Sequence, residues 1–598
     1  MIDLDDDAAG PQRSDEWQDA ARAVLAKQRR AVEGDPRQLL DSATVDGVPV
    51  PALAEPLETH RAAPGAFPFV RGGNRPDGAD RWDVRAWMSS RDAADGARVA
   101  EQELEGGSTS LWVVVGGDGT PVDAVPDLLG GVYLDLAPVV VEATGDVTPL
   151  SAARALSAVV ESRDGAPHPR TNLGIDPFGR ALRHGGAPDV ADVGPGAELG
   201  GRLGIRSLIV DGTAAADLGA GDVAEVAFLV ASGLECLRVL EEAGVGLRDA
   251  LGQLEFRVSV TDEQFVTIAK LRAARLLWAA VTRECGAAPA DGLMRQHAVT
   301  SRAMLTRYDP WTNLLRTTVA AFAAGVAGAE SVTVLPFDTS VGRPVSLSRR
   351  MARNISTLLV DESHVAIAAD PAGGSYAVER LTDDLAEAAW ARVQQVEAVG
   401  GMRKALVDKT FQEIVEEDRE ARRVLVGSRR RPVTGVSEFP LAGETLLQRE
   451  PWSTPQVSGW AADFERLRDE SAPVPVVLAT MGPVAEHTAR ASFATNLLTA
   501  GGVRCESAGA TAGPADVVPL LAKSGTAAVV VLAGSDAQYA SDGAAYIEAL
   551  RQAGAEWVVL AGKPSPEMAP LVDDHIATGQ DAIDVLQRLR ARLEGGHS

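Results

Sequence analysis

The chain has 598 residues, 45% of them hydrophobic and 23% charged, which excludes wholesale disorder and leaves enough apolar surface for large cores. Its 57 basic and 83 acidic residues give a formal net charge of −26. A field of that sign repels phosphate backbones and anionic lipid, so neither nucleic acid nor a membrane is expected as a partner. Cys236, Cys285 and Cys505 lack CxxC spacing and indicate neither a zinc site nor a disulfide framework. Since the N-terminus is acidic and no apolar stretch could span a bilayer, we expect a cytoplasmic protein.

Residues 1–60 predict an arm rather than a folded unit. A polar helix is expected near Ser14 to Glu33, followed by an acidic stretch that contains proline. Its narrow apolar stripe consists of Trp17, Ala20, Ala21, Val24 and Leu25. A helix of this length at a chain end is marginal in water unless such a stripe is buried, so the arm should lie on another surface.

Residues 61–402 alternate short apolar runs with amphipathic helices. The runs RSLIVDG (206–212), SVTVLPFD (331–338) and HVAIAADP (364–371) are typical of buried strands. Helices are predicted over 223–243, ending at Gly244; after a capping box of Thr261 and Gln264; and from Thr382 to Gly400, with the stripe Leu385, Ala389, Val393 and Val396. Strands separated by helices pair in parallel, and over this length they favour a (β/α)8 barrel.

Three local motifs have plain structural interpretations. GPGAELG (194–200) does not follow a strand and has the wrong glycine spacing for a dinucleotide loop, so a turn-rich loop is predicted. VVVGGDG (113–119) does follow a strand and could cradle a phosphate, but a strand-to-helix turn is favoured. The basic run 429–431 is interpreted as a solvated or interface patch.

The rest of the chain forms a connector and a second domain. Residues 403–472 are interpreted as a linker, because a charged helix is followed by a stretch rich in Pro, Arg and Trp. Residues 473–598 contain three strand-like runs with helices between them, which predicts a doubly wound domain of flavodoxin type. The expected fold class is therefore α/β, a (β/α)8 TIM barrel followed by a flavodoxin-like domain. The eight histidines are dispersed, and only His487, after the first strand of the second domain, lies in a promising place.

Three long segments resemble the adenosylcobalamin-dependent acyl-CoA mutases, specifically the methylmalonyl-CoA mutase family. They are KLRAARLLWA (270–279), HAVTSRAMLTRYDPWTNLLRTTVAAFAA (297–324) and DPAGGSYAVERLTDDLAEAAWARVQQVEAVGGM (370–402). The resemblance implies a substrate-binding barrel, a linker and a cobalamin-binding domain. It also implies radical interconversion of methylmalonyl-CoA and succinyl-CoA, with the hard chemistry supplied by the cofactor.

The residues that act in this family are missing at the matching positions of the second domain. Active members carry D-x-H-x-x-G after its first strand, where the histidine binds cobalt. Here Val484, Glu486 and Ala489 stand in place of the Asp, His and Gly, and His487 is one residue out of register. The nucleotide-tail motifs Ser-Ser-Leu and Gly-Gly correspond to Ala533, Gly534 and Ser535, and then to Gly562 and Lys563, whose side chain is expected to fill the tail space.

The barrel shows the same loss. Where active members have S-G-Y-H after the strand RSLIVDG, this chain has Asp211, Gly212, Thr213 and Ala214. A hydroxyl and a methyl group cannot hold and polarise a thioester carbonyl as a phenol and an imidazole do.

Because the functional residues are replaced in both domains, this chain resembles the non-catalytic small subunits of the family. That resemblance implies a one-to-one heterodimer with a large (alpha) subunit that carries adenosylcobalamin and binds the acyl-CoA, with the N-terminal arm wrapped around the partner. It also implies no catalytic, cofactor-binding or metal-binding residue on this chain. Two alternatives stay open: an independently active mutase that uses His487, and a regulatory binding partner of a mutase.

Overall fold

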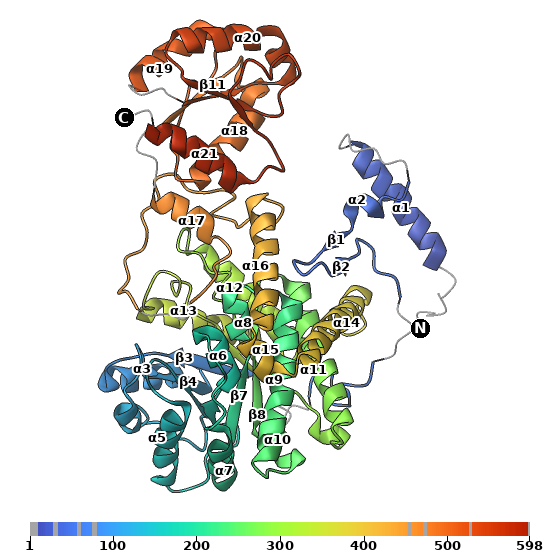
Figure 1. Ribbon diagram of the computed structural model, residues 1–598, viewed down its shortest axis with the longest axis vertical. Coiled ribbons are helices and arrows are strands. Elements are labelled where there is room, and N and C mark those ends of the chain that lie inside the picture. Colours follow the sequence, from blue (N-terminus) through green and yellow to red (C-terminus); the bar gives the residue numbers. More distant parts are fainter. Residues whose placement is uncertain are drawn as a thin grey trace.

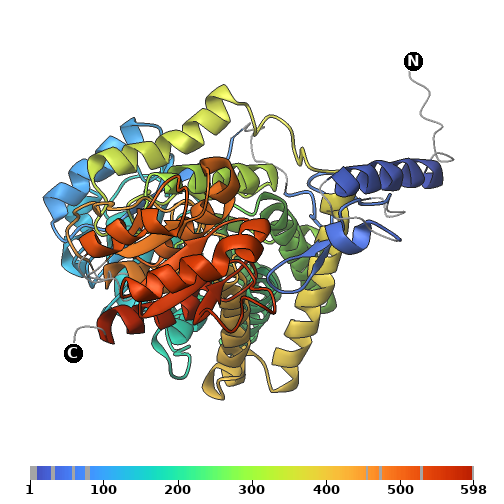
Figure 2. The same cartoon turned by 90° about the horizontal axis from the view of Figure 1, so that it is seen from above.

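The structure is a computed structural model that describes residues 10–27, 34–56, 61–73, 81–452, 456–470, 475–524 and 529–595. A barrel forms the lower body, a second α/β domain lies above it, and the N-terminal segment extends to one side (Figure 1). Seen from above, the second domain lies over the barrel (Figure 2). Among the described residues, no helix is both long and apolar enough to cross a membrane.

Eight parallel strands close the barrel in the order β10-β3-β4-β5-β6-β7-β8-β9, which confirms the predicted (β/α)8 fold. The strands are β3 Asp83–Met88, β4 Ser110–Val115, β5 Val139–Ala143, β6 Asn172–Ile175, β7 Arg206–Asp211, β8 Leu254–Val260, β9 Gln296–Thr300 and β10 Ser331–Thr333. The helices around them are α3 Ala93–Glu105, α4 Val125–Leu128, α5 Pro149–Glu161, α6 Pro177–His184, α7 Val193–Leu203, α8 Thr213–Leu218, α9 Asp222–Glu242, α10 Leu247–Gln253, α11 Gln264–Glu284, α12 Thr312–Val326 and α13 Ser346–Thr357.

A second layer of helix covers part of the barrel. Helix α14 (Tyr376–Ala398) packs on α9 and α11, and the chain continues through α15 (Met402–Val407) and α16 (Thr410–Gly427). The predicted stripe of α14, from Leu385 to Val396, is buried. Because α14 covers their outer sides, α9 and α11 are buried around most of their circumference, and the polar Lys270 and Arg272 of α11 lie inside the protein.

Several local predictions were wrong. Residues 364–371 form turns instead of a strand, because β10 has already closed the barrel against β3. Segment 194–200 lies inside helix α7 rather than in a loop; its glycines allow close packing, since a Cβ on Gly196 would lie 2.0 Å from the Cδ1 of Ile175. Helix α14 begins at Tyr376, six residues before Thr382.

The predicted capping box of α11 is also absent. The N-cap residue is Glu263, whose side chain makes no capping bond. The hydroxyl of Thr261, directly after β8, lies 3.2 Å from the hydroxyl of Thr267 and accepts from the amide of Glu263 at 3.4 Å. Neither contact is the bond from the Gln264 amide that a capping box requires. Segment 113–119 does form a turn after β4, as predicted, in which the amide of Gly116 donates to the carbonyl of Thr120.

The second domain is a parallel sheet with helices on both faces. Its strands are β11 Val476–Thr480, β12 Cys505–Ser507, β13 Val529–Ala533, β14 Trp557–Ala561 and β15 Asp574–Ile576, in the order β12-β11-β13-β14-β15. The helices are α18 Val484–Ala500, α19 Val518–Ser524, α20 Asp536–Gln552 and α21 Ala582–Gly595. This strand order is that of flavodoxin-like folds and confirms the predicted class.

The connector between the domains lies on the carboxyl-end face of the barrel. It includes α17 (Ala462–Asp469), and its amides at Ser458 and Trp460 donate to the carbonyls of Asp217 and Ala303. Of the basic run in this connector, Arg429 pairs with Glu438 and Arg431 pairs with Glu263, so both contribute to contacts within the chain.

The N-terminal segment has two parts. Helix α1 (Gly10–Lys27) lies beside the short α2 (Arg37–Leu40) and away from the barrel in both views (Figures 1 and 2). A hairpin of β1 (Ser42–Ala43) and β2 (Pro49–Val50) instead lies on the barrel's own helices, because Asp46 in its turn accepts bonds from the amides of Asp222 and Val223 at the start of α9. Among the described residues of this segment, helices α1 and α2 before the hairpin extend away from the barrel.

The hairpin contact should depend on pH. Burial, and then the neighbouring Asp222 and Asp418 carboxylates, raise the pKa of Asp46 to about 7, while the Val223 amide and Arg422 act in the opposite direction. An acid with a raised pKa favours the docked state when it is protonated, so docking should weaken as the pH rises from its unfolded pKa, near 4, through 7.

Amide exchange, corrected for the intrinsic pH dependence of exchange, tests this expectation. Protection of residues 42–50 is expected to fall by at least about tenfold between pH 5.5 and pH 8. In Asp46→Asn, which keeps the size of the side chain but not its titration, protection should be independent of pH. Equal pH dependence in both proteins would contradict the role of Asp46.

Candidate functional site

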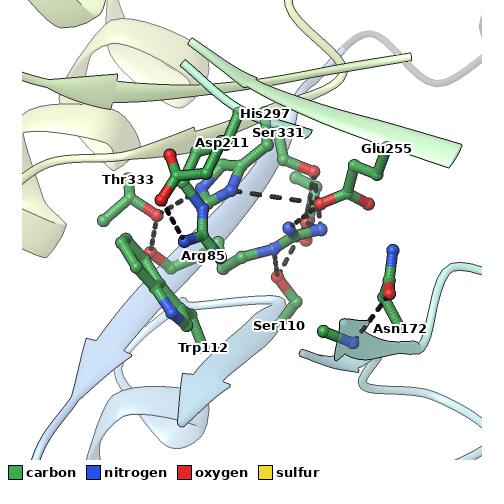
Figure 3. A network of polar contacts seen from close by, with 12 residues as sticks. Arg85, Ser110, Trp112, Asn172, Asp211, Glu255, His297, Ser331 and Thr333 are labelled. Atoms are coloured by element: carbon green, nitrogen blue, oxygen red, sulfur yellow. Dashed lines mark hydrogen bonds and ion pairs between the residues drawn. The ribbon is translucent and has the colours of Figure 1, made fainter. Parts of the chain in front are cut away.

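The interior of the barrel is filled by a layer of ion pairs and hydroxyl groups. Arg85 on β3 binds Glu255 on β8 at 2.5 Å, and the hydroxyl of Ser331 on β10 accepts a further bond from its guanidinium. Ser110 and Ser331 both donate to the carboxylate of Asp83, each at 2.7 Å. Figure 3 shows these side chains meeting inside the strands. They reach one another because alternate residues of every strand point into a barrel.

The charges in this layer are stabilised by one another. Burial is the largest single influence on the pKa values of Asp83 and Glu255 and works to raise them. The opposing contributions together outweigh it, from Arg85 and hydroxyl groups at Asp83 and from Arg85 and Arg206 at Glu255. Both pKa values therefore lie below their usual range. Since Asp83, Arg85, Ser110, Glu255 and Ser331 are all buried, the layer is a fixed structural element that leaves no space for a ligand among them.

Above this layer lies an aromatic and cationic layer. The Arg257 guanidinium lies 3.9 Å from the centre of the Trp112 ring, and the His297 ring packs edge-on against the same indole at 5.5 Å. The indole N–H of Trp112 donates to Glu142. These contacts fill the middle of the barrel, where Figure 3 shows Trp112 and His297.

His297 is held in its neutral form. Burial, together with the nearby Arg85 and Arg257, lowers its pKa well below the usual range. The Thr333 hydroxyl donates to the carbonyl of Arg85, so it must accept from the Nε2–H of His297 at 2.7 Å. A neutral imidazole with this hydrogen on Nε2 is locked to the barrel wall and is not available to a substrate.

The positions matching the substrate contacts of the family lie at the carboxyl end of the barrel. Asp211, at the end of β7, contacts Arg183 and Arg257 and accepts a 2.6 Å bond from the Thr213 hydroxyl. Burial works to raise the pKa of Asp211, but the two arginines outweigh it and lower the pKa to about 2. Thr213 and Ala214 are both buried, so neither presents a group to a ligand.

A large hollow lies at the other end of the barrel. Among the described residues it encloses about 1360 Å³ at the amino ends of the strands, and its lining includes Arg170, Arg206 and Arg295. Arg206 also binds Glu255 at 3.0 Å, so this ion pair separates the hollow from the barrel interior. The hollow borders Gly73 and Arg81, which flank the undescribed segment 74–80.

The carboxyl edge of the second domain's sheet is the other place where a ligand would be expected. Helix α18 begins at Val484, directly after β11, so Val484, Glu486 and Ala489 lie on its exposed side. His487 is 4% exposed, and its Nδ1 lies 3.2 Å from the carbonyl oxygen of Met481. Since a carbonyl oxygen only accepts, Nδ1 carries the hydrogen and the ring points into the domain.

Polar side chains tie the loops at this edge together. Gln538 of α20 donates to the Met481 carbonyl and lies over Gly482, where a Cβ would come within 2.1 Å of its amide nitrogen. Arg490 of α18 donates to the Gly534 carbonyl at 2.8 Å, and the Tyr539 hydroxyl donates to the Ala561 carbonyl at 2.8 Å. The loops after β11, β13 and β14 are thereby closed on one another.

The prediction for Lys563 at this edge was wrong. Lys563 was expected to fill the space beside Gly562, but its side chain is exposed, and Arg490 lies against Gly562 instead. Ala533 is buried at the end of β13, and Ser535 caps helix α20 through a bond from the Gln538 amide. The side chains present here do not fit cobalamin, because His487 points into the domain and the loops that would receive a nucleotide tail are bonded together. Among the described residues no cluster of three or more metal-binding side chains exists.

Comparison with known proteins agrees with these features. The sequence model of the family described as methylmalonyl-CoA mutase matches residues 203–514. The methylmalonyl-CoA mutase small subunit of Streptomyces virginiae is 42% identical, covering 97% of this chain and 96% of that protein. The chain belongs to the methylmalonyl-CoA mutase family, in its small-subunit branch. The small subunit of Propionibacterium freudenreichii subsp. shermanii is 35% identical over 91% of this chain and 88% of its own length, and a probable small subunit of Mycobacterium tuberculosis is 38% identical over 99% of both.

The ionic layer itself was not predicted from the sequence of this mutase-family chain. A signal for it exists, because Asp83 and Arg85 in DVRAWM, and Glu255 and Arg257 in LEFRVSV, place charges two residues apart in strands that are otherwise apolar. Since alternate residues share a face, such spacing puts both charges of each strand inside the barrel.

Breaking the central ion pair should destabilise the barrel strongly. Arg85→Met leaves the buried Asp83 carboxylate without its arginine and Glu255 with Arg206 alone, and is expected to lower the free energy of unfolding by about 3–5 kcal/mol. The matched control is Arg98→Met, which removes an exposed pair with Asp95 and should cost less than about 1 kcal/mol. Urea unfolding followed by circular dichroism measures both, and equal losses would contradict the role given to Arg85.

Proposed function

We propose that this chain is the non-catalytic small subunit of a heterodimeric methylmalonyl-CoA mutase. It pairs one-to-one with a large subunit that binds adenosylcobalamin and acyl-CoA and interconverts (R)-methylmalonyl-CoA and succinyl-CoA in the cytoplasm. One observation carries the proposal: both places where a mutase of this family would hold its ligands are occupied by the chain's own side chains. Asp211, Arg183 and Arg257 fill the barrel mouth, and Gln538 and Arg490 close the edge of the second domain.

The chemistry of these side chains supports a structural role. Bound adenosylcobalamin supplies radical chemistry, and the protein around it must bind, orient and shield the reacting groups. Here the carbonyl-polarising imidazole and phenol are absent, Thr213 donates its hydrogen to Asp211, and the hydroxyl is not free for a thioester. The neutral His297 is bonded to Thr333. In this proposal the chain binds no ligand and contributes a rigid surface on which the large subunit assembles.

Turnover by the separated and combined subunits tests this proposal. The purified chain with adenosylcobalamin and methylmalonyl-CoA is expected to show no turnover, and addition of the large subunit should restore it. His487→Ala in the complex should change turnover less than about twofold, because the ring faces the Met481 carbonyl. Turnover by the lone chain that His487→Ala abolishes would favour an independently active mutase instead.

A regulatory binding partner is the remaining alternative, and stoichiometry distinguishes it. A small subunit forms a stable one-to-one complex in the absence of any nucleotide. Association that is substoichiometric and depends on a nucleotide would support the regulatory role. Analytical ultracentrifugation of the mixed subunits measures this directly.

The N-terminal helix should contribute mainly to pairing. Helix α1 lies away from the barrel, Leu25 is its one buried member of the predicted stripe, and Val24 is 53% exposed. Deleting residues 1–35 is therefore expected to weaken the heterodimer by at least about tenfold, a loss of roughly 1.4 kcal/mol, while changing the melting temperature of the lone chain little. Unchanged affinity for the large subunit, together with a large fall in melting temperature, would place this helix on its own barrel.

A further inference from the structure

The outer side of helices α12 and α13 carries an unusual concentration of exposed apolar side chains. We call it the α12–α13 surface. The exposed apolar side chains on these helices and at their ends are Trp311, Leu315, Val345, Leu347 and Leu358, and Phe439 and Leu441 are exposed on the connector. The two helices are neighbours, and the connector that carries Phe439 and Leu441 is bonded to α12 where Arg316 donates to the Thr434 carbonyl. Both helices lie on the outside of the barrel in Figure 2.

Helix α12 presents no charge to the outside. Its residues that are not fully buried are Thr312, Leu314, Leu315, Thr318, Val319 and Phe322, and its single charged residue, Arg316, is buried. An outer barrel helix that faces water ordinarily carries polar and charged residues on that side. In a chain with 23% charged residues, an uncharged outer face with Leu315 at 68% exposure indicates a surface that a partner covers.

Helix α13 adds a cation that lacks a counterpart. Arg350 is exposed on the same helix as Leu347, and it forms no hydrogen bond or ion pair with any residue of the described part of the chain. By contrast, its neighbour Arg353 binds Glu103. In a chain with 26 more acidic than basic residues, an arginine left unpaired beside an apolar surface fits an acidic group on a partner.

Charge also decides between the possible occupants. Two copies of this chain, each with a net charge of −26, repel one another, and a symmetric contact through this surface would bring Arg350 of one copy to the surface that holds Arg350 of the other. A different chain can supply the missing acidic group. We propose that the α12–α13 surface is the docking site for the large mutase subunit, with an acidic residue of that subunit opposite Arg350. This inference rests on the proposed function and adds to it the surface through which the barrel pairs.

Single charge substitutions on this surface test the proposal in the full-length chain. Leu315→Glu and Leu358→Glu are each expected to weaken binding to the purified large subunit by roughly 30-fold or more, because each places a carboxylate in the apolar contact. Arg350→Glu should weaken it by about tenfold and reduce its dependence on salt. Leu136→Glu is the matched control, because Leu136 is 71% exposed and lies in the segment that joins β4 to β5, outside the α12–α13 surface. This substitution should change the affinity less than about threefold.

The possible outcomes separate this surface from the function it rests on. If the wild-type chain does not bind the large subunit, both proposals fail. If the wild type binds and Leu315→Glu and Leu358→Glu bind equally well, with unchanged circular dichroism and melting temperature, only the docking surface is wrong. A homodimer of the lone chain that Leu315→Glu dissociates would identify a second copy as the occupant and overturn the choice of partner.

Discussion

Arg85 lies inside the barrel with a carboxylate on either side, and the filling of the interior depends on that arrangement. Asp83 and Glu255 are charged because Arg85 is there, and the serine hydroxyls and Arg206 complete the set of bonds. Buried ion pairs contribute little net stability compared with apolar packing, but removing one member is costly. The layer therefore fixes one arrangement of the strands and leaves the interior closed.

The same principle operates in the second domain, where side chains bond backbone carbonyls rather than carboxylates. Gln538 and Tyr539 of α20 and Arg490 of α18 satisfy carbonyl groups at the ends of three strands. Carboxyl ends of strands in doubly wound sheets are where ligands are ordinarily bound. In this domain helix side chains bond those carbonyls, so the loops at this edge are held by contacts within the chain. The architecture of the family can therefore be retained where its ligand-binding motifs are replaced, as the proposed function requires.

Much of the fold could be predicted from the sequence, because its main signals are local. The run RSLIVDG is apolar and becomes β7, and the stripe from Leu385 to Val396 is buried in α14. The errors have physical causes. Segment 364–371 is as apolar as a strand but follows the closure of the barrel, and α7 contains glycines that serve packing rather than turns. A local sequence pattern shows neither where the barrel closes nor where a helix packs closely against a strand.

At the candidate site, the sequence mainly predicted which functional residues of the family are missing. Val484, Glu486 and Ala214 could be identified from their places in segments that resemble the family. The groups that surround Asp211 could not, because Arg183 lies on α6 and Arg257 on β8, and they meet only in the folded barrel. Likewise, the inward direction of His487 depends on where α18 begins, and sequence patterns place helix ends poorly.

The stoichiometry of adenosylcobalamin in the purified heterodimer tests the central claim most directly. If the ligand positions of this chain are occupied by its own side chains, titration followed by visible absorbance should saturate at one cofactor per heterodimer. The lone chain should then cause no spectral change at micromolar concentrations. Saturation at two cofactors per heterodimer, or a bound-cobalamin spectrum with the lone chain, would contradict the account.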